Sequence, residues 1–326
     1  MKLIKRTVAL LLAVLLLTVA ACSGGGEGAP VKDTPNETGE DGKGAESPLL
    51  WRATDEQGRV IWFFGTIHMG DKRSDQVIKR LGSVLEQCDA LAVEFDAVAY
   101  AKDLKSQQRD LVQLVYTDGT NIRDHIPADL YNKLTDLLKG ENLYLKIYDQ
   151  YKPAMWYQLF NQAMISKTEL SSNKAIDTLL IKNANLAGRE VLEVESAQFQ
   201  YDMLANTPDD YYILAMSNDI EAEDELTDSL NELYEVWLKG DEERLAELLS
   251  EADDIEDLSA EEKKLVEDFN KKLVTDRNIG MAGKAKEYVA GGKTVFFAVG
   301  AMHFLGEDGI VSLLKNEGFT FERVYI

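Results

Sequence analysis

The chain has 326 residues, of which 45% are apolar, 28% charged and 9% aromatic. This composition is typical of a globular protein and excludes a collagen-like, coiled-coil or wholly disordered chain. Acidic residues number 57 and basic residues 35, which gives a net charge of −22. A nucleic-acid-binding surface needs basic residues to neutralise phosphates, so we expect no nucleic-acid partner. The two cysteines are too few for a disulfide framework.

Residues 1–22 have the features of a bacterial lipoprotein signal peptide. Basic residues at positions 2, 5 and 6 precede an apolar run from Thr7 to Ala21, which is too short to span a bilayer comfortably. The run ends in small residues before Cys22, a pattern that resembles the lipobox in which the cysteine is lipidated. We therefore predict that Cys22 anchors the mature protein to the cell membrane in an extracytoplasmic position. An ordinary secretory signal with a chance cysteine is the alternative.

Residues 23–48 are predicted to form a flexible linker between this anchor and a folded domain at 49–326. Gly, Pro, Ser, Glu and Asp dominate the linker, which has almost no side chains to bury. No later stretch of the sequence is long and apolar enough to be a membrane helix.

The first part of the domain is predicted to be a hairpin followed by a helix and a strand. The hairpin strands are 49–54 and 60–67, with a polar turn between them. A helix over 74–88 has apolar residues at helical spacing and Ser74 as its N-cap. The next strand, 90–96, is apolar and turns acidic at its end. This order predicts a right-handed crossover and a parallel pair of strands.

The rest of the domain is predicted to be mostly helical, with strands returning at the C-terminus. The expected helices fall within 100–165, at 175–186, 208–249 with a break at Gly240, 259–289 and 307–316; the expected strands are 191–195, 294–299 and 319–326. Because strands lie at both ends, we expect one α/β domain. Its mixed, partly parallel central sheet would unite the N- and C-terminal segments around a large helical insertion.

The most informative pattern is an internal echo at the ends of two apolar strands. Gly65-Thr66-Ile67-His68 and Gly300-Ala301-Met302-His303 share the form Gly-x-x-His, and each is followed by a glycine and an acidic residue. Ligands of open α/β sheets bind at the carboxyl ends of strands. We therefore favour a site shared by the two histidines over two separate, partly buried strand caps. The third histidine, His125, lies in a polar segment and is predicted to be on the surface.

Two strand-end carboxylates extend this candidate site. Glu94 and Glu195 each follow an apolar run, and a buried carboxylate has to be paired, protonated or bound to a metal. Two histidines with one or two glutamates form a common ligand set for Zn, Mn or Fe, with one carboxylate free to act as a base. Asp96 and Glu193 lie two residues from these glutamates, either as supporting groups or as solvated strand ends.

Arg277 and Asn278 form a polar pair within an otherwise apolar-periodic helix. One interpretation is an ordinary surface pair. The other is a clamp for a carbonyl or carboxylate group of a substrate, since both side chains donate hydrogen bonds.

These segments together resemble the TraB/GumN family, which includes the animal Tiki proteases. The resemblance covers about Leu49 to Ile326, and the similar blocks within it are 50–52 (LWR), 65–71 (GTIHMGD), 91–96 (LAVEFD), 191–195 (VLEVE), 237–241 (WLKGD), 277–278 (RN) and 299–309 (VGAMHFLGEDG). The family's usual glycine shortly before Asp177 is absent here. The resemblance implies a metal-dependent protease whose site uses His68, His303 and Glu94.

The leading hypothesis is a membrane-tethered metallohydrolase that acts on a peptide or protein. Its divalent ion (Mn, Co or Zn) would be bound by His68 and His303. Glu94 or Glu195 would be the third ligand and the other glutamate the general base, while the Arg277–Asn278 pair would stabilise the oxyanion. Two alternatives remain open: a non-enzymatic lipoprotein that binds a peptide or signal, and a metal-independent, esterase-like hydrolase with a histidine base.

Overall fold

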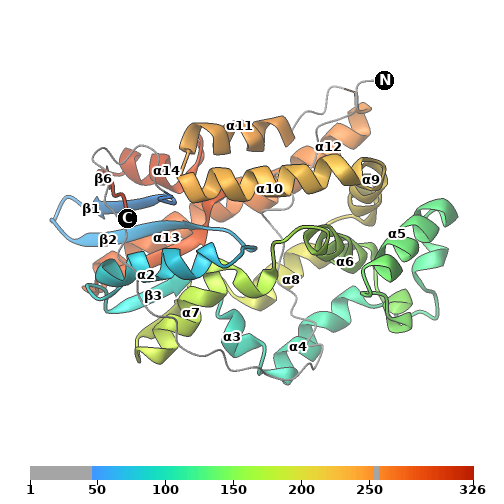
Figure 1. Cartoon of the computed structure of the whole chain (residues 1–326), viewed down its shortest axis with the longest axis horizontal. Helices are drawn as coiled ribbons and strands as arrows, with labels where there is room; N and C mark the ends of the chain where they lie inside the picture. Colours follow the sequence, from blue (N-terminus) through green and yellow to red (C-terminus); the bar gives the residue numbers. More distant parts are fainter. Residues whose placement is uncertain (1–45, 253–256) are drawn as a thin grey trace.

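A six-stranded sheet forms one end of the molecule, and helices build the other end (Figure 1). The computed structural model describes residues 46–252 and 257–326. The predicted signal peptide, the predicted lipidation site at Cys22 and nearly all of the predicted linker therefore lie outside the described residues. The α/β class and the mixed sheet predicted from the sequence are confirmed.

The sheet has the strand order β4-β3-β5-β2-β1-β6. β1 (Leu50–Thr54) and β2 (Val60–Thr66) form the predicted antiparallel hairpin. β2, β5 (Val295–Gly300), β3 (Ala90–Val93) and β4 (Glu190–Glu193) are mutually parallel. β6 (Thr320–Arg323) pairs with β1, so the sheet unites the two ends of the domain.

The predicted parallel relation of β2 and β3 holds, but the two strands are not neighbours. β5, from near the C-terminus, lies between them and pairs with both. The crossover helix α2 (Arg73–Leu85) therefore connects strands that are two positions apart. This insertion places the ends of both Gly-x-x-His strands side by side.

Aromatic side chains hold the central strands on both faces of the sheet. Phe63 packs against Phe297 and Phe304, whereas its neighbour Phe64 packs against Phe296 and Trp237. Successive residues of a strand point to opposite faces. A parallel sheet is stable when both faces are covered in this way.

Helices make up most of the chain between β3 and β5. They are α3 (Ala97–Tyr100), α4 (Leu104–Leu111), α5 (Ala128–Gly140), α6 (Pro153–Ser166), α7 (Ile176–Leu186), α8 (Ala197–Ala205), α9 (Asp209–Asp219), α10 (Glu223–Lys239), α11 (Glu242–Ala252), α12 (Ala260–Asn270) and α13 (Asp276–Ala290), and α14 (Ile310–Asn316) follows β5. α10 ends at Gly240, whose φ of 61° is left-handed, at the predicted break. The predicted 208–249 helix is also interrupted by a 3₁₀ turn at Ile220–Ala222.

The predicted N-cap of the first helix is wrong. α2 begins at Arg73, whose backbone N–H donates to the carboxylate of Asp71. Ser74 is buried inside the first turn, and its hydroxyl bonds to the hydroxyl of Tyr234 on α10. Asp71 supplies the side-chain acceptor because it lies two residues before the first free N–H group.

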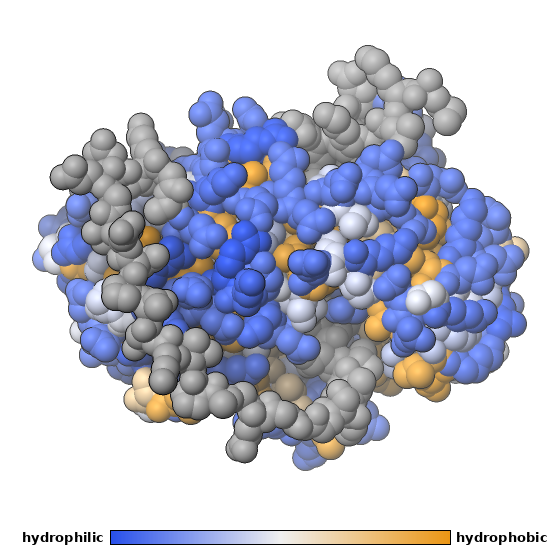
Figure 2. Space-filling view, in the orientation of Figure 1, coloured by the Kyte–Doolittle hydropathy of each residue, from blue (hydrophilic) through white to orange (hydrophobic). Residues whose placement is uncertain are grey.

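Hydrophilic residues cover most of the face shown in Figure 2, with apolar residues in small separate groups. Across residues 46–252 and 257–326, no helix combines the length and the apolar character needed to cross a bilayer.

Candidate active site

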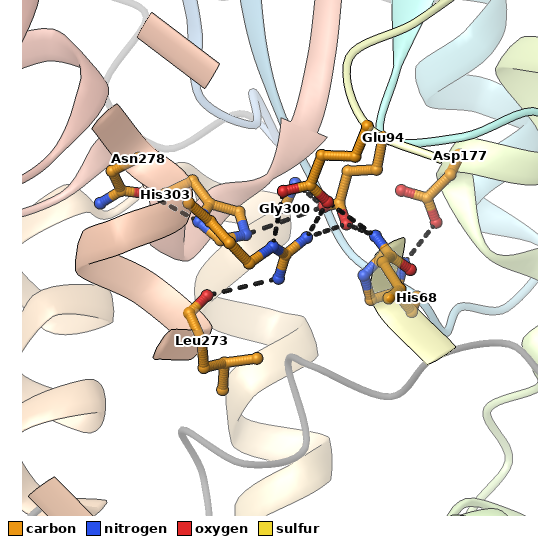
Figure 3. A network of polar contacts seen from close by, with 10 residues as sticks. His68, Glu94, Asp177, Leu273, Asn278, Gly300 and His303 are labelled. Atoms are coloured by element: carbon orange, nitrogen blue, oxygen red, sulfur yellow. Dashed lines mark hydrogen bonds and ion pairs between the residues drawn. The ribbon is translucent and has the colours of Figure 1, made fainter. Parts of the chain in front are cut away.

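Four of the predicted site residues converge at the carboxyl edge of the parallel strands. His68 follows β2, Glu94 follows β3, Glu195 follows β4 and His303 follows β5. Because these strands are parallel and adjacent in the sheet, their carboxyl ends lie along one edge. Figure 3 shows Glu94 between the two histidines.

Glu94 is the central group of this cluster. Its Oε1 atom accepts a hydrogen bond from the Gly300 N–H at 2.9 Å and lies 3.9 Å from Nε2 of His303. Its Oε2 atom accepts hydrogen bonds from Arg277 at 2.7 Å and from Gln200 at 2.9 Å. A Cβ atom at position 300 would lie 3.3 Å from Oε1 of Glu94. The glycine of the second Gly-x-x-His motif therefore permits the close approach of this carboxylate.

Arg277 holds the two glutamates together. Its Nε and Nη2 atoms each donate to Glu195 at 2.8 Å, in the bidentate geometry that favours arginine, and Nη2 also donates to Glu94. Its Nη1 atom donates to the Leu273 carbonyl at 3.3 Å. Leu273 lies in a π-helical segment, Lys271–Thr275, immediately before α13, and such segments are frequent at functional sites. Arg277 is 5% exposed, so the surface-pair interpretation is wrong.

The two histidines are oriented by different partners. Nδ1 of His68 lies 2.8 Å from a carboxylate oxygen of Asp177 on α7. Nδ1 of His303 lies 2.7 Å from Oδ1 of Asn278. The Asn278 amide nitrogen donates to the Asp308 carbonyl, which fixes the direction of the amide. Nδ1 of His303 must therefore carry a proton, and Nε2 is left for the centre.

Burial and neighbouring charges move the pKa values of these groups in different directions. Burial lowers the pKa of His68, but attraction to Asp177 and Glu94 outweighs it and raises that pKa to about 9. Burial and the Arg277 charge lower the pKa of His303 to about 3. Burial raises the pKa of Glu94, but the opposing pull of Arg277 and the histidines holds that pKa well below its usual range. In the absence of a ligand, His303 is thus neutral at pH 7 and His68 is protonated.

Backbone contacts fix the segment that carries His68. The indole Nε1 of Trp237 donates to the Gly65 carbonyl at 2.8 Å, and the Ile176 N–H donates to the Ile67 carbonyl. Gly70 pairs with Ser171 through two backbone hydrogen bonds. α7 and α10 therefore set the position of the first motif.

The two supporting carboxylates predicted beside the glutamates form a separate contact. The Glu193 side chain accepts the Asp96 N–H at 2.9 Å, and the Asp96 side chain caps α3 through the Ala99 N–H. They stabilise the loop after β3 and do not contact the central group. His125 is exposed, as predicted, and its ring stacks on Tyr116.

Sequence reasoning missed Gln200 and did not place Asp177 in the site. Gln200 is 1% exposed on α8 and donates to both glutamates. Its signal in the sequence is a polar residue on the apolar face of α8, shared with Ala197, Tyr201 and Leu204. Asp177 reaches His68 from 109 residues away along the chain, so no local pattern connects them.

The residue types at this centre, histidine and glutamate, are ones that commonly bind divalent metal ions. Each imidazole has its Nδ1 fixed by an oxygen and its Nε2 available, which is the usual arrangement of metal-binding histidines. Within the described part of the chain, however, no three or more His, Cys, Asp or Glu side chains are grouped so that they could hold a metal ion. Arg277 occupies one oxygen of Glu94 and both oxygens of Glu195.

The fold and the site together define an α/β protein with a histidine–glutamate–arginine centre at the edge of a mixed sheet. The model of the TraB/PrgY/gumN family matches residues 49–323, and the chain belongs to this family. A protein from Amphimedon queenslandica named "Metalloprotease TIKI homolog" is 23% identical over 322 residues. These cover 86% of this chain but only 62% of the relative, so the chain spans less than two thirds of that protein. No solved structure matches the chain.

Proposed function

We propose that this TraB/PrgY/gumN protein is a metal-dependent hydrolase and that its substrate is a peptide bond. The observation that carries the proposal is the pair of imidazoles with fixed Nδ1 atoms, arranged on either side of one carboxylate. The name of the Amphimedon queenslandica relative supports a peptide substrate. His68, His303 and Glu94 are the candidate ligands, and their side chains would have to move closer together than they lie in the structure to hold one ion.

The protonation state of His303 suits a metal ligand better than a general base. His303, with a pKa of about 3, is too weak a base to take a proton from water at pH 7. It is nevertheless a neutral imidazole, as a metal ligand has to be. His68 is held as an imidazolium by Asp177 and would release its proton when the ion binds. When bound, a divalent ion lowers the pKa of water so that hydroxide is available at neutral pH.

The remaining polar groups would orient the substrate. An arginine has five N–H donors, and Arg277 uses Nε, two on Nη2 and one on Nη1 in the contacts described above. The other Nη1 hydrogen would be its donor to an oxyanion. Asn278 is engaged at both ends of its amide, so its contribution passes through His303. Glu195 would hold Arg277 in place, which leaves Glu94 as the ligand.

The test is a comparison of metal content and turnover in a tag-free domain of residues 46–326. A library of fluorescence-quenched peptides is incubated with the chelated protein and with protein supplied with Mn²⁺, Co²⁺ or Zn²⁺. We expect cleavage only after metal addition and about one ion per chain by elemental analysis. His68→Ala and His303→Ala should each lower the metal content. About one ion per chain remaining in the double histidine variant would contradict the hypothesis that His68 and His303 bind one ion together.

The contacts of Arg277 favour a second candidate, a hydrolase without a metal. The guanidinium already neutralises part of the carboxylate charge that a divalent ion would need. In this case a peptide or ester would be cleaved equally well in the presence of a chelator. The same library therefore separates the two candidates.

We also propose that Cys22 tethers the protein to the extracytoplasmic side of the cell membrane, on the basis of the small residues before Cys22. Fractionation of cells that express Cys22→Ser tests the tether. The variant should move to the soluble fraction, and retention in the membrane would contradict the lipid anchor.

A further inference from the structure

Gln200 bridges the same two glutamates as Arg277, but the two side chains come from different helices. It lies on α8, one turn after the Ser196 side chain caps that helix. Its Nε2 atom donates to Oε2 of Glu94 at 2.9 Å and to Oε2 of Glu195 at 3.0 Å. An amide nitrogen carries two hydrogens, so each carboxylate receives one.

The same two oxygens also accept hydrogen bonds from Nη2 of Arg277, at 2.7 and 2.8 Å. Glu94 and Glu195 are therefore joined twice, once by a charged donor and once by a neutral donor. Two carboxylates this close repel each other, and both are largely buried. The second bridge offsets that repulsion without adding a second positive charge.

We infer that Gln200 is a positioning residue that fixes the rotation of the Glu94 carboxylate and presents its Oε1 atom to the histidines. With Oε2 held by Gln200 and Arg277, Oε1 is the atom that meets the Gly300 N–H and faces Nε2 of His303. A lysine or arginine at this position would cancel both carboxylate charges, whereas the amide leaves one negative charge for the centre. The effect on turnover rests on the proposed function, but the effect on Glu94 does not.

The test compares two glutamines of the same helix. Gln200→Met keeps the length of the side chain and removes both donors. Gln200→Asn keeps an amide but shortens the side chain, so that one nitrogen no longer reaches both carboxylates. Gln198→Met is the matched control, because Gln198 is exposed on α8. The first readout is the ring ¹⁵N spectrum of the chelated protein, which reports on the three histidines of the chain.

We expect both Gln200 variants to shift the signals of His303 and His68 and to leave the exposed His125 unchanged. Gln198→Met should change none of the three. On a peptide cleaved by the wild-type protein, Gln200→Met should lower kcat by roughly 10- to 100-fold with a smaller change in KM. A residue that merely stabilised the fold would lower the unfolding midpoint and leave the histidine signals of the folded protein in place.

The outcomes separate the positioning role from the proposed function. If no peptide is cleaved but the His303 and His68 signals move only in the Gln200 variants, the hydrolase proposal fails and the positioning role stands. If Gln200→Met does not fold, Gln200→Asn gives the same comparison. Folded Gln200 variants with histidine signals identical to those of the wild type and of Gln198→Met would overturn the inference.

Discussion

The two Gly-x-x-His segments look alike in sequence and differ in their electrostatics. His68 has a carboxylate partner, Asp177, and a pKa of about 9. His303 has an amide partner, Asn278, and a pKa of about 3. The His68 side chain is 17% exposed and that of His303 is 2% exposed. One motif therefore supplies a charged, partly accessible imidazole and the other a neutral, buried one.

The difference comes from the helices that meet each motif and not from the motif itself. α7 brings Asp177 to the first histidine, and α13 brings Asn278 to the second. A carboxylate stabilises an imidazolium, whereas burial near a guanidinium destabilises it. The repeated motif thus sets the position of each histidine in the fold. The side chain that contacts the histidine, together with its burial, determines its protonation state.

We expect the largest loss of turnover from substitution of Glu94, the carboxylate that lies between the two histidines. Glu94→Gln keeps the shape of the side chain and removes its charge, so turnover of a cleavable peptide should fall by roughly 10²- to 10⁴-fold. His68→Ala and His303→Ala should each cause a loss of similar size. The double variant should be little worse than either single variant, because groups that act as a unit are not additive. Losses that multiply would show that the histidines act independently.

The two histidines should give the metal-free protein opposite pH dependences of stability. The His68 pKa is raised, so its contribution to the free energy of unfolding is full below about pH 6.5 and is lost as the pH rises to about 9. The His303 pKa is lowered, so stability is lost as the pH falls from about 6.5 to about 3. Each slope is at most about 1.4 kcal/mol per pH unit. Urea unfolding at several pH values with chelator present measures both.

Exchanging the partners should move the two pKa values toward each other. Asp177→Asn removes the charge that favours the His68 imidazolium, and Asn278→Asp places such a charge beside His303. Each change should move the respective pKa by roughly 2 pH units, downward for His68 and upward for His303. NMR titration of the ring signals checks this, with His125 as the internal control. A His68 pKa that is unchanged in Asp177→Asn would contradict the assigned cause.

The glycines that follow the two histidines should differ in their tolerance of alanine. A Cβ atom on Gly70 would lie 2.6 Å from the Lys174 carbonyl oxygen and would also meet the Ser74 hydroxyl. Gly306 has open space but a φ of 76°. We expect Gly70→Ala to cost about 1–3 kcal/mol through overpacking and Gly306→Ala about 1–2 kcal/mol through backbone strain.

Gly82→Ala provides the control for this pair. Gly82 lies in the interior of α2 with nothing near its missing Cβ atom, so alanine there should stabilise the protein by about 0.5–1 kcal/mol. The unfolding midpoints of the three alanine variants give the order of their stabilities. A Gly70→Ala protein as stable as the wild type would mean that the loop at Lys174 moves aside freely.

Local patterns in the sequence were sufficient for the hairpin, for most helices and for the convergence of His68, His303 and the two glutamates at one edge of the sheet. An apolar run that ends in Gly-x-x-His or in a glutamate predicts a strand with a polar carboxyl end, and parallel strands bring such ends together. The position of β5 between β2 and β3 was not predictable in this way. Side-chain alternation along a strand indicates which face is buried, but it does not indicate which strand is the neighbour.

The partners of the central side chains were also beyond local reasoning. Asp177 and Gln200 lie on helices, where a single polar residue on a half-buried face carries no sign of what it meets. The π-helical segment before Arg277 adds a residue to a helical turn, a change that apolar periodicity does not register. Contacts that span about 100 residues depend on how the helices dock, and this is decided by the packing of the whole domain.

The smallest effect concerns the acidic residues at the ends of the two motifs. Asp71 is tied to α10: the Tyr234 hydroxyl donates to its carboxylate at 3.0 Å and accepts its backbone N–H at 3.2 Å. Glu307, the residue in the equivalent place after His303, is exposed. Tyr234→Phe removes these two hydrogen bonds and the one to Ser74 and should cost about 1–2 kcal/mol, while Glu307→Gln should stay within about 0.5 kcal/mol of the wild type. Urea unfolding at pH 7 measures both. Equal stability of the two variants would mean that the Tyr234 hydroxyl contributes nothing and that the first motif is held by its backbone contacts with Trp237, Ile176 and Ser171.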